Sequence, residues 1–123
     1  MPRGSNITGL YLTESDADPL VEAGKQWRAA HDRWNTATRT ATPLYGKRDA
    51  TIKERRYLAA ALRRADNAAG AMRDVENFAI ENPPSSVKGA LVVAEMIYDL
   101  VDHEEPEGAL VESLVTGLRK MTD

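Results

Sequence analysis

The sequence predicts an all-α protein, a helical bundle in which a long antiparallel helical hairpin is followed by one or two shorter C-terminal helices. Apolar residues recur at three- and four-residue spacing through most of the chain, which is the period of an amphipathic helix. Proline and glycine gather in the segments PLYG, NPPSSVKG and PEG, which divide this pattern into helix-sized stretches. The segment NTATRTATP alternates most like a strand, and we interpret it as the end of the first helix.

Length and composition limit the classes of protein. A chain of 123 residues fits one domain with its own core, and the absence of cysteine excludes disulfides and zinc-thiolate sites. We find no apolar run near the roughly 18 residues that span a bilayer and no signal-peptide pattern, so we expect a cytoplasmic protein without a membrane partner. Residues 1–15 are expected to be a flexible segment, with a tag remnant at 1–5, and residues 16–123 to form a single helical domain.

The first predicted helix begins near residue 19. Asp18 is suited to act as an N-cap, and Pro19 fits the first helical position because no backbone donor is needed there. Large and small apolar residues then recur in a seam of helical spacing. The seam consists of Leu20, Ala23, Trp27, Ala30, Trp34, Ala37 and Ala41.

A reversal of chain direction is expected around Pro43 and Gly46. Thr51 and Glu54 then form a T-x-x-E capping box that starts a second, long helix. The apolar stripe predicted for this helix consists of Leu58, Ala61, Leu62, Ala65, Ala68, Ala69, Met72, Val75 and Ala79.

Trp27 and Trp34 are interpreted as part of the hairpin seam. Their bulk complements the small side chains of Ala65, Ala68 and Ala69 on the facing helix, as dense packing requires. The alternative is that the two indoles form an interface with a partner.

Two further helices are predicted after the prolines of ENPPSSVKG, which end the second helix. Ser85 or Ser86 is expected to cap the third helix, which is apolar around more of its circumference and is predicted to be more deeply buried. Pro106 and Gly108 interrupt before a short final helix. The apolar face predicted for it consists of Leu110, Leu114, Val115 and Leu118.

The charges are segregated, although the net charge is only -3. Acidic residues dominate the C-terminal third, whereas basic residues gather in a segment that we call the basic elbow, residues 47–64. Its candidate binding residues are Lys47, Arg48, Lys53, Arg55, Arg56, Arg63 and Arg64. They are either solvated faces that attract the acidic end, within the chain or across a dimer, or contacts for nucleic-acid phosphates. The acidic isoelectric point near 5.4 opposes the second interpretation.

Motifs for catalysis are absent from the sequence, so we expect no enzyme, no catalytic residue and no cofactor. Asp99 and His103 have the i, i+4 spacing of two metal ligands on a helix. No E-x-x-H pair accompanies them, and we interpret the segment as a charged helix end that holds no metal. His31, between the two tryptophans, is expected to be a flanking residue.

The order of two tryptophans, an Ala/Arg-rich helix and PPSSVKGAL resembles a group of short uncharacterised helical proteins of bacterial and prophage genomes. In that group a proline, Ser or Thr residues and a glycine open the third helix; here these are Pro84, Ser85, Ser86 and Gly89. The resemblance covers roughly residues 17–121. It implies no biochemical activity and favours an accessory protein of phage or mobile-element origin.

These observations together favour a non-enzymatic accessory protein that acts by binding another macromolecule. The expected partner is a protein, including a second copy of the chain in a homodimer. A nucleic-acid-binding protein that uses the basic elbow is the alternative.

Overall fold

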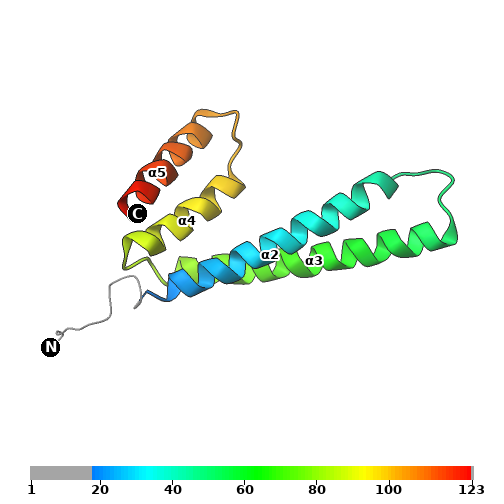
Figure 1. Cartoon of the computed structure of the whole chain (residues 1–123), viewed down its shortest axis with the longest axis horizontal. Helices are drawn as coiled ribbons and strands as arrows, with labels where there is room; N and C mark the ends of the chain where they lie inside the picture. The colour runs from blue at the N-terminus through cyan, green and yellow to red at the C-terminus, as the bar shows by residue number, and fades with distance from the viewer. Residues whose placement is uncertain (1–17, 123) are drawn as a thin grey trace. The chain divides into compact units, whose positions relative to one another are not determined.

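A computed structural model describes residues 18–122 and confirms the all-α fold (Figure 1). Within this range the chain forms four α-helices and one short 3₁₀ helix, and no strand. In chain order they are α2 (Pro19–Ala41), η2 (Thr42–Leu44), α3 (Ile52–Glu81), α4 (Val87–Leu100) and α5 (Pro106–Thr122). The segment expected to be flexible at 1–15, with the tag remnant at 1–5, lies outside the described residues.

The described residues form two compact units. Residues 25–77 contain most of α2, the turn that follows it and most of α3. Residues 18–24 and 78–122 form the other unit, which contains α4 and α5. Both α2 and α3 run without interruption from one unit into the other. The single helical domain expected at 16–123 stays a prediction.

The unit of residues 25–77 is an antiparallel hairpin of α2 and α3 (Figure 1). Near its open end the indole Nε1 of Trp27 donates a hydrogen bond of 3.0 Å to Oε2 of Glu76. At its closed end Thr40 lines the same hollow as Tyr57. The core between the helices is built mainly from small side chains. Its buried members are Trp27, Ala30, Ala37, Ala41, Ala61, Ala65, Ala68, Met72 and Val75.

The predicted seam is confirmed in part. Trp27 is buried, but Trp34 is only half-buried. Because Trp27 bonds to Glu76, it meets α3 near its C-terminal end, about two to three helical turns past the small residues Ala65, Ala68 and Ala69 that the two indoles were predicted to fill. Leu62 was predicted on the apolar stripe of α3 and is exposed.

The other unit is organised around Asp18, the predicted N-cap of α2. The Oδ1 atom of Asp18 accepts the backbone N–H of Leu20 at 3.0 Å. Its Oδ2 atom accepts the backbone N–H of Ser85 at 3.0 Å and the hydroxyl of Ser86 at 2.7 Å. The Ser86 Oγ in turn accepts the N–H of Gly89 at 2.9 Å, which makes Ser86 the N-cap of α4. One carboxylate therefore ties the first turn of α2 to the first turn of α4.

The two C-terminal helices form a second hairpin, and the predictions for them are confirmed in part. An ion pair of 3.2 Å between Arg119 and Glu95 joins α5 to α4. The third predicted helix, α4, buries Gly89, Val92, Ala94 and Met96, whereas Ile97 and Leu100 near its end are exposed, so its predicted burial is confirmed only in part. The break predicted at Pro106 and Gly108 lies slightly earlier, between Leu100 and Pro106, and Pro106 opens the last helix in the first helical position that proline favours.

The apolar face predicted for α5 is also confirmed only in part. Val115 is buried and Leu118 is half-buried, as predicted, but Leu110 and Leu114 are exposed. The final helix therefore carries more apolar surface than its contact with α4 covers. Among residues 18–122, no helix has the length and apolar character that crossing a membrane requires.

Candidate functional site

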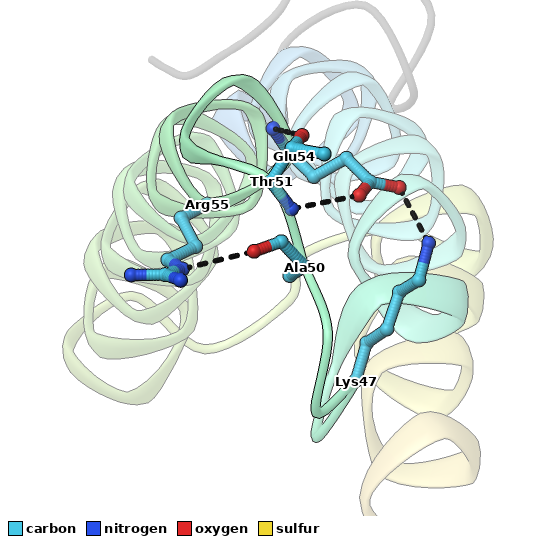
Figure 2. A network of polar contacts seen from close by, with 5 residues as sticks. All are labelled: Lys47, Ala50, Thr51, Glu54 and Arg55. Carbon is cyan, nitrogen blue, oxygen red and sulfur yellow. Dashed lines mark hydrogen bonds and ion pairs between the residues drawn. The ribbon is translucent and has the colours of Figure 1, made fainter.

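The turn between α2 and α3 is held in one conformation by local hydrogen bonds (Figure 2). The predicted capping box is confirmed: the N–H of Glu54 donates to Oγ1 of Thr51 at 3.0 Å, and the N–H of Thr51 donates to Oε1 of Glu54 at 2.9 Å. Lys47 Nζ pairs with Oε2 of Glu54 at 2.7 Å. Gly46 has a φ of +78°, a conformation that favours glycine and lets the chain turn back toward α3.

These bonds also fix the charge of Glu54. The hydrogen bond from Lys47, helped by the backbone N–H of Thr51, lowers the pKa of the Glu54 carboxyl below its ordinary value. The carboxylate therefore stays ionised and neutralises Lys47, which leaves that lysine with a structural role in the turn.

The seven basic residues of the elbow fall into two groups. Lys47 is paired with Glu54, and Nε of Arg55 donates to the carbonyl oxygen of Ala50 at 3.2 Å (Figure 2). The other five cations are exposed and have no polar partner within residues 18–122. They are Arg48, Lys53, Arg56, Arg63 and Arg64. The elbow thus offers unneutralised positive charges in the turn, at Arg48, and along α3, at the other four residues.

An open hollow of about 700 Å³ lies beside the elbow, and we call it the elbow hollow. Its lining residues are Thr40, Pro43, Leu44, Lys53, Glu54, Arg56 and Tyr57. Pro43, Leu44 and Tyr57 supply apolar surface, and the side chain of Tyr57 is 57% exposed. Lys53 and Arg56 stand three residues apart on α3, so they share a side of the helix. The site combines two free cations with an exposed aromatic ring.

A second hollow of about 480 Å³ lies farther along the hairpin. It contains Arg64 together with Asp32 and Arg33 from α2. Arg64 is eleven residues, or about three helical turns, after Lys53, so the two lie toward the same side of α3. Arg55 lies two residues from Lys53 and therefore points to a different side. The structure brings Lys53 and Arg56 together at the elbow hollow, places Arg64 farther along the same side of α3 and leaves Lys47 and Arg48 in the turn.

No family model, curated protein or solved structure matches this chain. The resemblance to short helical proteins of prophage genomes therefore stays a prediction.

Trp27 and Trp34 belong to a row of rings on α2. The centroid of the His31 ring lies 5.1 Å from that of Trp27 and 6.2 Å from that of Trp34. Asn35 Nδ2 also lies 3.2 Å from Nδ1 of His31, to which it can donate. His31 flanks the two indoles, as predicted. Trp27 belongs to the hairpin seam, whereas the half-buried Trp34 retains exposed surface.

The Asp99 and His103 pair does not share a helical face. The helix ends at Leu100, and the His103 ring stacks on Tyr98 with centroids 4.0 Å apart. His103 Nε2 lies 2.5 Å from the carbonyl oxygen of Tyr98, to which it donates. Within the described part of the chain, no group of three or more His, Asp or Glu side chains could hold a metal ion.

The basic residues of the site were predicted from the sequence, whereas the apolar residues that line the elbow hollow were not. Pro43, Leu44 and Tyr57 were not predicted as binding residues. Spacing gave no signal for Tyr57, because it lies four residues before Ala61 and eleven before Ala68, on the side of α3 that carries the buried residues. Pro43 and Leu44 gave no signal either, since turns commonly contain proline and the sequence does not show what a turn covers.

Proposed function

We propose that this chain is a non-enzymatic interaction protein that binds a partner protein at the elbow hollow. One observation carries the proposal: the unpaired cations Lys53 and Arg56 stand beside the exposed ring of Tyr57 and the half-buried side chain of Leu44. Tyrosine and arginine are enriched at the energetic centres of protein interfaces, where an apolar contact and a charge act together.

The lining of the hollow defines the chemistry of the partner. Apolar walls favour an aliphatic or aromatic side chain, while Lys53 and Arg56 favour carboxylates close to it. An acidic segment that presents large apolar side chains satisfies both requirements. The rigid turn supports such binding because the capping box and the pair of Lys47 with Glu54 leave little of the elbow to be ordered.

Fluorescence anisotropy tests the proposal with a labelled helical peptide of glutamate and leucine at i, i+3 and i+4 spacing. We expect the peptide to bind the intact chain and to lose affinity in Leu44→Ala/Tyr57→Ala and in Lys53→Glu/Arg56→Glu. The matched control is Arg73→Glu, an exposed arginine of α3 that has no polar partner among the described residues and lies outside both hollows. Equal affinity in all four chains would contradict the proposal.

Nucleic acid is a second candidate partner because Arg63 and Arg64 continue the row of free cations beyond the hollow. A phosphate backbone needs this longer row, whereas a peptide in the hollow does not. We therefore expect Arg63→Glu/Arg64→Glu to abolish binding of a labelled single-stranded oligonucleotide and to leave the acidic peptide bound. Oligonucleotide affinity should also fall steeply with salt. An oligonucleotide affinity that changes neither in the double variant nor with salt would exclude nucleic acid as the partner.

Two further parts of the proposal concern the origin and location of the chain. The resemblance to short helical proteins of bacterial and prophage genomes favours an origin in a phage or mobile element. The absence of cysteine suits the cytoplasm, a reducing compartment in which structural disulfides rarely form. Localisation of a tagged full chain in its source cells tests the second point, and recovery outside the cytoplasm would contradict it.

A further inference from the structure

The outer side of α5 carries an apolar ridge that nothing in the described chain covers. We call this ridge the α5 ridge; it consists of Leu110, Leu114 and Met121, whose side chains are 71%, 52% and 68% exposed. Their spacing of four and seven residues places them on one side of the helix. Val115, which is buried, belongs to a different side.

Negative charge surrounds the N-terminal end of the α5 ridge. Glu104, Glu105 and Glu107 lie at the start of α5 or just before it, and none of their carboxylates has a partner within residues 18–122. Glu107 is three residues before Leu110 and shares its side of the helix. The surface therefore combines large exposed side chains with free carboxylates.

We infer that the α5 ridge of one copy of this chain docks into the elbow hollow of a second copy. The inference rests on the proposed function, because it names the partner of the same hollow. The two surfaces are complementary: Leu110 and Leu114 match the apolar walls of the hollow, and Glu107 with its acidic neighbours matches Lys53 and Arg56. Since every copy carries both surfaces, each copy can offer its ridge to one neighbour and accept a ridge in its own hollow.

Reversal of the charges on each surface tests this contact in the full-length chain. One variant, Lys53→Glu/Arg56→Glu, makes the hollow acidic. The other, Glu105→Lys/Glu107→Lys, makes the end of the ridge basic. Each variant alone brings like charges together, whereas an equimolar mixture restores opposite charges at both contacts. Sedimentation velocity over a wide concentration range measures association, and far-UV circular dichroism confirms that each variant is folded.

We expect the unmodified chain to associate as its concentration rises and each variant alone to associate roughly tenfold or more weakly. The mixture, and a chain carrying all four substitutions, should regain association. An unmodified chain that stays monomeric at every concentration overturns the inference, as does association that neither variant weakens. Loss in the single variants without recovery in the mixture overturns it as well.

The peptide assay separates this inference from the proposed function. A monomeric chain that still binds the glutamate and leucine peptide through Lys53 and Arg56 retains the proposed function and excludes a second copy as the partner. A chain that associates by another surface and does not bind the peptide contradicts both.

Discussion

Asp18 shows how much structure a single buried carboxylate can organise. The residue is 3% exposed, and its two oxygens accept three hydrogen bonds from Leu20, Ser85 and Ser86. Burial acts to raise the pKa of Asp18, but the hydrogen bonds from Ser86, Leu20 and Ser85 outweigh it and hold the pKa below its ordinary value of 3.8. The carboxylate is therefore ionised and fully partnered.

Replacing Asp18 by Asn should destabilise the fold. The amide keeps the size of the side chain, but its nitrogen cannot accept the hydrogen bonds that one carboxylate oxygen now accepts. We expect the free energy of unfolding in urea to fall by about 1–3 kcal/mol, the cost of leaving buried donors without a partner. The control is Asp66→Asn on the exposed side of α3, which should change stability by no more than about 0.5 kcal/mol. Equal effects of the two substitutions would contradict a special role for Asp18.

The lowered pKa predicts how this stability depends on pH. Because the folded-state pKa of Asp18 lies below the unfolded value, its contribution is fully present above pH 3.8 and is lost as the pH falls through the folded-state pKa. Unfolding in urea at a series of pH values measures it. The difference in stability between the unmodified chain and Asp18→Asn should be constant near neutral pH and shrink in acid. A difference that grows in acid would contradict the assignment.

For single residues at the helix starts, the sequence was informative about contacts between near neighbours. Asp18 as an N-cap, Ser86 as one of two possible caps and the capping box of Thr51 with Glu54 were all predicted and are confirmed. The bond between Asp18 and Ser86 was not predicted, since capping patterns report on neighbouring residues and carry no information about which helix ends meet.

Among the helices, the first turn of α4 depends on a glycine for close packing. A Cβ atom at Gly89 would overlap the Asp18 carboxyl group, which cannot move aside without losing its hydrogen bonds. At Gly70, in the middle of α3, a Cβ atom would meet nothing within 4 Å. Both glycines are therefore helical, but Gly89 has no room for a Cβ atom and Gly70 has ample room.

Alanine at these two glycines should have effects of opposite sign. In an open helical position, Gly70→Ala should raise the free energy of unfolding by up to about 1 kcal/mol, because alanine loses less backbone entropy in a helix. Gly89→Ala should lower it, since the overlap with Asp18 outweighs that gain. Thermal unfolding followed by circular dichroism measures both. Stabilisation by both substitutions would show that Asp18 moves without cost.

The apolar periodicity of α5 explains why its faces were predicted wrongly. Two apolar rows run along this helix, one through Val111, Val115 and Leu118 and one through Leu110 and Leu114. Period alone does not distinguish a row that packs inside the chain from a row that faces outward. The same limit explains Leu62 of α3, which fits the predicted stripe and is exposed.

Across the whole molecule, the continuity of α2 and α3 through both compact units predicts cooperative unfolding. Both tryptophans lie in the unit of residues 25–77, so their fluorescence reports on that unit. Far-UV circular dichroism reports on all helices. We expect the two signals to change at the same urea concentration, and separate midpoints would contradict the prediction of a single helical domain.

The candidate site was predictable only in its charges. Clustering of basic residues in the sequence identified the elbow, and five of its seven cations are free in the described structure. Which of them act together depends on how α3 is turned toward η2, and that is decided by the core and the capping box. Helical spacing already separates Lys53 and Arg56 from Arg55, but the pair of Lys47 with Glu54 and the apolar walls beside the two free cations required the structure.

The sequence distances between bonded residues have a consequence for the order of folding. The ion pair of Lys47 with Glu54 spans seven residues, the bond of Trp27 with Glu76 spans 49, and the bond of Ser86 with Asp18 spans 68. Closing a longer loop costs more entropy, so local contacts form earlier. The hairpin is expected to zip outward from its turn, with the bonds of Asp18 to Ser85 and Ser86 completed last.

A contact that forms after the transition state of folding affects the unfolding rate and not the folding rate. Asp18→Asn should therefore accelerate unfolding while leaving the folding rate nearly unchanged, because the bond is absent from the transition state. Stopped-flow measurements in urea separate the two rates, and a folding rate that drops with stability would place this closure early instead. If the closure is late, the junction of α2 and α4 is also where the folded chain first reopens.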